Sequence, residues 1–183
     1  INKILIKDSI NSKPIIFEND DEIMGKVIFN KEMHKIAIQK LVNLKILKTG
    51  INIDTTKILP NKNLLIKNKQ YEFKKIIISM GKNIFSNTAH KSIIFNQQHC
   101  SYVGFFNHSI DHDNIAYEFF THKGPLAVLP APAKNKKKST FIYSSKEMIN
   151  ELQIKKLIRK HISKFHGKLY FDDLPISKFP IAP

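Results

Sequence analysis

The chain has 183 residues, of which 42% are apolar and 25% charged, a balance that excludes intrinsic disorder and is typical of a folded domain. Lys and Arg number 30 against 15 Asp and Glu, so the formal net charge is +15, and the single cysteine, Cys100, excludes a disulfide framework and a multi-cysteine metal site. There is no apolar run of about 18 residues and no basic segment leading into an apolar one, so we expect neither a membrane-spanning helix nor a signal peptide.

Residues 1–44 predict strands followed by a helix. Alternation of apolar and polar residues predicts strands at 1–7, 14–18 and 26–29. Asn30 is a favourable N-cap, and we expect a helix from there to about Leu44. The apolar residues of this helix recur on one face, which we interpret as packing against a core: Met33, Ile36, Ala37, Leu41 and Leu44.

Residues 45–79 predict only short strands separated by turns. The five expected strands are 45–47, 56–59, 64–66, 71–73 and 75–79. The last of them holds Ile76, Ile77 and Ile78, a β-branched run that is apolar on both faces and therefore typical of a buried strand.

A β-hairpin is the clearest element of the second half of the chain. Strands at 116–121 and 126–130 flank His122-Lys123-Gly124-Pro125, a natural connection between antiparallel strands. A longer strand is expected within 93–106 and another at 140–144.

The C-terminal part predicts two helices and a late strand. Ser144 followed by Glu147 is a capping-box pattern, which predicts a short helix directly after it. A second helix is expected from Ile154 to Phe165, with a buried apolar stripe, with Gly167 as its C-cap and with a strand at 168–171 behind it. Together these elements predict an α+β fold, a mixed and mostly antiparallel sheet with helices packed against it.

The positive charge permits two interpretations. Arg159 is the single arginine, so lysine supplies nearly all of the charge, whereas arginine is the usual bidentate reader of guanine and phosphate. The dense run from Lys134 to Lys138 follows Pro132 and precedes a strand, where we expect a solvated loop. We therefore expect no nucleic-acid partner. The alternative, a non-catalytic basic module that binds nucleic acid or an anionic membrane, stays open.

Residue clusters give no catalytic or metal site by themselves. One cluster holds metal-binding types of side chain: His108, Asp111, His112 and Asp113. Its spacing matches no closed set of ligands, so we expect a polar turn and no metal. Cys100 follows His99 on a strand, where neighbours point to opposite faces, so a structural thiol is expected rather than an activated one. No GxSxG, HExxH, P-loop or GxGxxG motif is present.

Three segments of the chain form an informative combination. Residues 22–30 read Glu-Ile-Met-Gly-Lys-Val-Ile-Phe-Asn, residues 116–130 read Ala-Tyr-Glu-Phe-Phe-Thr-His-Lys-Gly-Pro-Leu-Ala-Val-Leu-Pro, and residues 178–181 read Lys-Phe-Pro-Ile. In this order and at these separations they resemble the middle section of the ubiquinone-biosynthesis flavin hydroxylases. These are the 2-polyprenyl-6-methoxyphenol hydroxylases, which share the fold of para-hydroxybenzoate hydroxylase. The resemblance covers essentially the whole chain.

The resemblance implies a flavin-dependent monooxygenase that hydroxylates an aromatic ring, with FAD and NAD(P)H as cofactors of the full-length family. The flavin performs the oxygen chemistry, so no catalytic side chain is expected, and the protein positions the ring and excludes water. By resemblance the hairpin lines the substrate cavity, with Gly124, Leu126 and Val128 facing a prenylated phenol. The alternative is that both faces of the hairpin are core.

The cofactor site of the family is incomplete in this chain. The first glycine-rich strand–turn–helix of the family and its late Gly-Asp segment are both absent. The family's Ala-Asp-Gly-x-x-Ser-x-x-Arg motif falls on residues 79–87, where Gly81 is retained as a cofactor-binding residue. Met80, Ile84 and Asn87 replace the aspartate, serine and arginine. We therefore expect the isolated chain to be inactive and to bind FAD poorly; a structural remnant without any ligand is a third interpretation.

The resemblance also implies how the chain is organised. Residues 1–42 and 91–183 correspond to the substrate-binding domain, and residues 43–90 to a segment of the FAD domain. We expect a cytoplasmic protein with peripheral contact to the inner membrane. Without the family's first βαβ unit the strand at Ile76 to Ile78 lacks neighbours, so we expect self-association through that exposed edge.

Overall fold

The computed structural model describes residues 1–8, 13–19, 22–53, 63–66, 69–79, 99–171 and 176–181. The chain forms two compact units, one made of Ile1–Met33 with Gln97–Ala182 and the other of His34–Asn96 with Pro183. The first unit carries the main sheet and the second a two-stranded ribbon. The assignment of residues 43–90 to an FAD domain stays a prediction.

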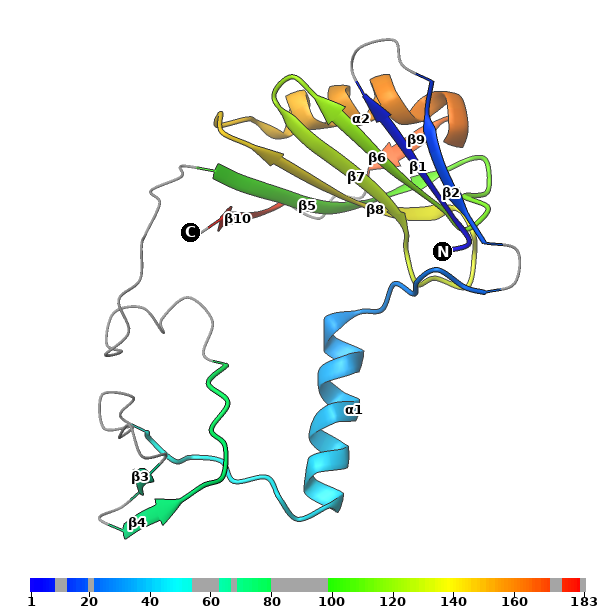
Figure 1. The fold of residues 1–183 in the computed structure, drawn as a ribbon. Helices are drawn as coiled ribbons and strands as arrows, with labels where there is room; N and C mark the ends of the chain where they lie inside the picture. Colours follow the sequence, from blue (N-terminus) through cyan, green and yellow to red (C-terminus); the bar gives the residue numbers. More distant parts are fainter. Residues whose placement is uncertain are drawn as a thin grey trace. The chain divides into compact units, whose positions relative to one another are not determined.

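Eight strands of the first unit form one mixed sheet (Figure 1). Their order is β10-β5-β8-β7-β6-β1-β2, and β9 pairs with β5 beside this path. All pairs are antiparallel except β1 and β6, which run parallel. The strands are β1 (Lys3–Asp8), β2 (Ile15–Glu18), β5 (His99–His108), β6 (Ile115–Thr121), β7 (Gly124–Pro130), β8 (Lys138–Ser145), β9 (Leu169–Phe171) and β10 (Ser177–Ile181). The α+β fold with a mixed, mostly antiparallel sheet is therefore confirmed.

Helix α2 (Glu151–His166) covers one face of this sheet, the helix face (Figure 1). Its apolar stripe is fully buried, since Ile154, Ile158 and Ile162 are 1%, 0% and 0% exposed. Burying a side chain of this size stabilises a fold by about 1.5–3 kcal/mol. The helix-face core consists of Tyr102, Phe106, Tyr117, Phe119, Leu126, Val128, Phe141, Tyr143, Ile154, Ile158, Ile162 and Leu169.

Helix α2 begins at Glu151, three residues before the predicted start at Ile154, and Asn150 is its N-cap. The side chain of Asn150 accepts the backbone N–H of Gln153 at 2.9 Å, and the side-chain oxygen of Gln153 accepts the N–H of Asn150 at 3.0 Å, a complete capping box. Gly167 closes the helix with a φ of 70° and donates its N–H to the carbonyl of Ser163. The C-cap was predicted correctly.

The short helix predicted directly after Ser144 is wrong. Backbone N–H groups of this segment donate hydrogen bonds to side chains instead of to a helical carbonyl. The N–H of Glu147 donates to the hydroxyl of Ser145 at 3.1 Å, and the N–H of Ile149 donates to the hydroxyl of Tyr102 at 3.0 Å. The carboxylate of Glu147 pairs with Lys123 at 2.6 Å instead of capping a helix. These contacts hold residues 146–150 as an irregular connection.

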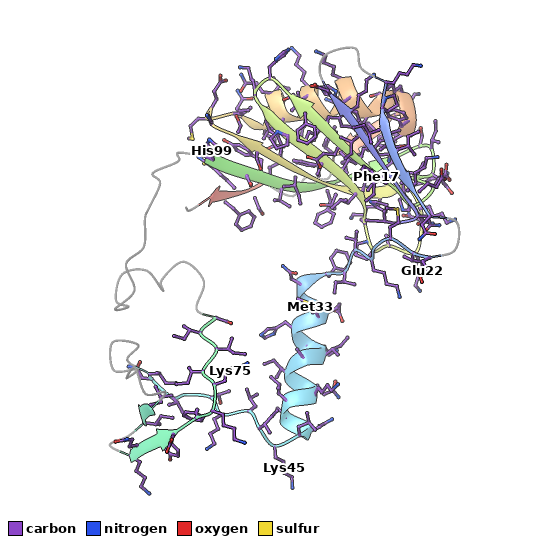
Figure 2. All side chains as sticks on the ribbon, in the orientation of Figure 1. Phe17, Glu22, Met33, Lys45, Lys75 and His99 are labelled. Carbon is purple, nitrogen blue, oxygen red and sulfur yellow. The ribbon has the colours of Figure 1, made fainter. Side chains whose placement is uncertain are left out.

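Helix α1 (Asn30–Asn43) forms as predicted, but its stripe is not core. None of its side chains is buried, and Met33 and Ile36 are 51% and 65% exposed (Met33 is labelled in Figure 2). The packing interpretation of this stripe is therefore wrong for the structure as described. A regular apolar period predicts which side chains share one face of a helix, but it does not indicate whether another element covers that face.

The second unit contains a two-stranded antiparallel ribbon of β3 (Asn63–Ile66) and β4 (Lys69–Glu72), close to the predicted strands. The strand predicted at 75–79 is wrong, because this stretch is irregular and Ile77 is 83% exposed. No described strand lies beside it, so β propensity alone does not hold it extended in a sheet. The edge on which self-association was expected is thus missing, and self-association itself stays a prediction.

Two further strand predictions are wrong, and a third is not tested. Residues 26–29 and 45–47 are irregular, and residues 56–59 lie outside the described residues. In the part of the chain that the structure describes, no helix is both long and apolar enough to cross a lipid bilayer.

Candidate functional site

The turn between β6 and β7 depends on a glycine. The hydroxyl of Thr121 donates to the carbonyl of Gly124 at 2.6 Å and closes the turn. Gly124 has a φ of +138°, and a Cβ at this position would lie 1.9 Å from the carbonyl oxygen of Ser144. A side chain would therefore be strained by its own backbone and would also collide with β8. The hairpin can approach β8 this closely because residue 124 is a glycine.

Two of the predicted substrate-facing residues lie in the helix-face core. Leu126 and Val128 are 0% and 1% exposed and belong to the same buried cluster as Ile154 and Ile158 of α2. A guest molecule could reach them only if the helix moved away. Their contact with a substrate stays a prediction, and their burial favours the alternative that this face of the hairpin is core.

The opposite face of the sheet, the open face, is not covered by α2. Side chains of a strand alternate between faces, so Ala127 and Leu129 of β7 lie on the open face when Leu126 and Val128 lie on the helix face. Apolar side chains of the open face remain exposed: Ile15, Phe17, Phe120 and Ile142 are 59%, 47%, 50% and 37% accessible (Phe17 is labelled in Figure 2). An exposed apolar surface of this kind is typical of a binding face.

The register of the strands aligns one residue from each into a row across the open face. The row runs through Ile15, Ile6, Glu118, Ala127, Ile142, Val103 and Ser177. Neighbouring strands lie about 4.8 Å apart, so the distance along the row from Glu118 to Val103 is about 14 Å. The aromatic ring of Phe29 packs near one end of this surface, 6.1 Å from the ring of Phe105.

Glu118 is the one carboxylate in this row. Burial raises the pKa of its carboxyl group above the ordinary value, since the neighbouring side chains withdraw it from water. A half-buried carboxyl among apolar residues can hold a polar group of a ligand by a hydrogen bond. No sequence pattern indicated this residue, because its position in the row depends on pairing with β1 and β7, which no local pattern reveals.

A hollow of about 420 Å³ borders the turn of the hairpin. Gly124 and Pro125 line it together with residues from the end of β8 and with His99 at the start of β5 (labelled in Figure 2). Leu126 and Val128 do not line it. The glycine–proline corner of the hairpin thus lies beside a cavity, whereas the two apolar residues that follow do not.

The predicted polar turn at residues 108–113 contains two histidines that are buried. His108 and His112 are 3% and 5% exposed, and they meet His166 of α2, which is 1% exposed. The ring centroids of His108 and His166 are 4.3 Å apart, and the hydroxyl of Ser139 lies 2.9 Å from Nε2 of His108 and 3.5 Å from Nε2 of His166. Among the described residues, no group of three His, Cys, Asp or Glu side chains is arranged to hold a metal ion.

These imidazoles are held in their neutral form. Burial lowers the pKa of all three, and the pKa of His166 falls to about 3 because the rings of His108 and His112 also lie nearby. Nδ1 of His166 is buried without a hydrogen-bond partner. The cluster is thus a buried element of the core that is sensitive to acid. The spacing of the residues in the sequence could not have indicated that His166 lies beside His108 and His112.

The remaining candidates divide between the core and the part of the chain that is not described. Cys100 is a free thiol, half-buried, and packs against the helix-face core, as expected for a structural cysteine. Gly81, with Met80, Ile84 and Asn87, lies outside the described residues. The cofactor-binding role of Gly81 stays a prediction.

Comparison with known proteins finds a likeness in structure alone. No protein-family model and no curated protein matches the chain. Among solved structures, a geranylgeranyl bacteriochlorophyll reductase-like protein from Thermoplasma acidophilum superposes with a TM-score of 0.57 at 14% sequence identity. The match covers 98% of this chain and 50% of that protein. The chain has the fold of part of a reductase-like protein. At this identity the likeness shows the fold, and the more specific assignment to the ubiquinone hydroxylases remains a proposal.

Proposed function

We propose that this chain is the substrate-binding part of a flavin-dependent aromatic-ring monooxygenase of the 2-polyprenyl-6-methoxyphenol hydroxylase kind, acting in ubiquinone biosynthesis. Three observations support the proposal: the resemblance of the hairpin segment, the fold shared with a reductase-like protein, and the apolar row on the open face with its one carboxyl, that of Glu118. The row on the open face is the main support for the proposal, because it offers an apolar surface with one polar group, the carboxyl of Glu118. A prenylated phenol combines the same two properties.

In this proposal the phenol hydroxyl donates a hydrogen bond to the carboxylate of Glu118. The prenyl chain lies over Ala127, Ile142 and Val103, which follow Glu118 along the row. The distance of about 14 Å along the row, across four strands, accommodates a chain of two or three isoprene units. Gly124 serves this surface indirectly, because it lets the hairpin pack close to β8.

The described residues do not fit FAD on their own. A dinucleotide is usually held where a strand turns through glycines into a helix. Of the described helices, α1 follows the irregular segment 22–29 and α2 follows the irregular segment 146–150. In the proposed enzyme the flavin and the NAD(P)H are therefore bound by residues other than those that the structure describes. We further propose a cytoplasmic location with peripheral contact to the inner membrane, because a prenylated phenol partitions into lipid.

The proposal is tested by binding of geranylphenol to the full 183-residue chain, followed by NMR shifts of the side-chain methyl groups. We expect saturable binding that does not weaken with salt, with shifts confined to methyl groups of the open face. Ile142→Lys should weaken binding at least tenfold, since it places an ammonium on the apolar row. Leu152→Lys is the matched control, because Leu152 is a 66% exposed aliphatic residue of α2 and should leave affinity unchanged.

Glu118→Gln tests the polar anchor. A hydrogen bond to a charged group contributes about 1.5–3 kcal/mol, so we expect roughly tenfold weaker binding of geranylphenol and no change for geranylbenzene, which lacks the hydroxyl. Shifts on the helix face, or equal losses in Ile142→Lys and Leu152→Lys, would contradict the proposed face.

A second candidate function is a basic module that binds nucleic acid or an anionic membrane. The observation that favours it is the loop between β7 and β8, where Lys134, Lys136 and Lys137 are all exposed. Binding to an oligonucleotide or to acidic vesicles that falls steeply with salt would support this alternative. Salt-insensitive binding of geranylphenol would support the first proposal.

A further inference from the structure

A second cavity, of about 460 Å³, is lined by residues of both faces of the sheet, among them Phe119 from the helix face and Phe120 from the open face. It lies beside α2, the end of β1 and the turn between β6 and β7. Its apolar lining includes Phe119, Leu157 and Tyr143. We call it the lysine pocket, because Lys7, Lys123, Lys160 and Lys164 line it as well.

Helical spacing and strand register bring the cations together. Leu157, Lys160, His161 and Lys164 are separated by three, one and three residues, so they share one side of α2. Lys7 pairs in register with Phe119, whose ring lies 5.0 Å from the ring of His161. Three ammonium groups from β1 and α2 therefore face one half-buried imidazole.

The titration of the groups in the pocket reflects this crowding. Burial lowers the pKa of His161 first, and the positive charges of Lys160, Lys164 and Lys7 lower it further. The pKa of Lys164 is also lowered, first by partial desolvation and then by the ammonium of Lys7. Like charges four residues apart on a helix, such as Lys160 and Lys164, destabilise it. The arrangement is unfavourable for the empty protein.

Few negative charges balance these cations. Lys123 is engaged with Glu147 at 2.6 Å. Among the described residues lining the pocket, Asp8 is the one carboxylate, and it has an interaction of its own. Among the described lining residues, the ammonium groups of Lys7, Lys160 and Lys164 thus outnumber the carboxylates in a concave site with apolar walls. A compact anion with more than one negative charge would relieve the repulsion between all three at once.

We propose that the lysine pocket binds a phosphate or diphosphate group, whose attached apolar portion packs against Phe119 and Leu157. Lys7, Lys160 and Lys164 hold the phosphate oxygens, and His161 lies beneath them. The site is independent of the proposed function, because none of the residues proposed to hold the phenol, Glu118, Ala127, Ile142 and Val103, lines it.

The test is titration of the full chain with inorganic pyrophosphate and, separately, with octyl phosphate, followed by the NMR signal of the His161 ring. Because a bound phosphate neutralises the surrounding ammonium groups, we expect saturable binding together with a rise in the pKa of His161. Octyl phosphate should bind more tightly than inorganic phosphate, titrated in the same way, if the apolar wall takes part. Phosphatidylcholine vesicles with and without phosphatidic acid distinguish a lipid headgroup from a free phosphate as the source.

Lys164→Met and Lys160→Met should each weaken pyrophosphate binding at least tenfold, which corresponds to about 1.4 kcal/mol. Lys134→Met is the matched control: it removes the same charge from the exposed β7–β8 loop and should change affinity less than twofold. Without a ligand, Lys164→Met should melt at the same or a higher temperature than the wild type, which shows that the variant folds. The proposal is overturned if no phosphate probe saturates the site, or if Lys134→Met and Lys164→Met lose affinity equally.

Discussion

Acidification should destabilise the main-sheet unit through the buried histidines His108, His112 and His166. Burial is the first cause that lowers the pKa of each imidazole, and His166, at 1% exposure, reaches about 3. A histidine whose folded pKa lies below its unfolded value of 6.5 takes up its proton in the unfolded state first. Its contribution to stability is therefore complete above pH 6.5 and is lost as the pH falls toward 3.

The size of the effect follows from the shift of His166. For each such histidine the free energy of unfolding falls by about 1.4 kcal/mol per pH unit inside this window. Between the unfolded pKa of 6.5 and a pH of about 4.5, His166 alone lowers the free energy of unfolding by about 3 kcal/mol. A domain of this size has a total of about 5–15 kcal/mol, so the loss is readily measured.

The assay is urea unfolding followed by circular dichroism, at about pH 7 and about pH 4.5. His166→Phe keeps an aromatic ring beside Phe106 and Tyr117 and removes the titrating group, so its loss on acidification should be about 3 kcal/mol smaller than that of the wild type. His34→Phe, at an exposed position of α1, is the matched control and should behave like the wild type. If His166→Phe loses as much stability in acid as the wild type, the reasoning from burial is refuted.

Three further predictions concern the hairpin, the helix cap and the cofactor. Gly124→Ala should lower the free energy of unfolding by more than about 3 kcal/mol, because its Cβ would collide with the carbonyl of Ser144. Gly50→Ala is the control, since Gly50 also has a positive φ but has open space around it, and it should lower the free energy of unfolding by only about 1 kcal/mol. Equal losses in thermal melts would contradict the close approach of residue 124 to β8. Asn150→Ala should cost about 1 kcal/mol in urea unfolding, since it removes the capping box with Gln153, and an unchanged midpoint would exclude that role. The purified chain should retain no FAD absorbance after dialysis and show no hydroxylase activity, and a stoichiometric flavin complex would refute this expectation.

The sequence predicted those elements whose signals are local and strong. The hairpin strands have clear alternation, and the stripe of α2 at Ile154, Ile158 and Ile162 is buried as its period indicated. Gly167 was recognised as a C-cap from its place after the stripe. The predictions at residues 145 and 75–79 failed because partners far along the chain decide them: Glu147 pairs with Lys123, and Ile77 has no strand beside it among the described residues.

The site was harder to predict than the fold. Alternation separates Leu126 and Val128 from Ala127 and Leu129, but only the packing of α2 decides which pair is covered. Glu118 joins the open face through two strand pairings. The lysine pocket combines β1 with α2, which are separated by most of the chain, so no motif could have indicated it.

The main sheet joins strands from distant parts of the chain, since β1 pairs in parallel with β6. The main sheet is discontinuous in sequence, because the unit of residues 34–96 is inserted between β2 and β5. The entropy lost on closing such an excursion grows only with the logarithm of its length, about 0.6 kcal/mol for each doubling. Evolution can therefore lengthen, shorten or exchange the inserted unit with little penalty to the sheet, which makes this junction a natural point for grafting a different module onto the same framework.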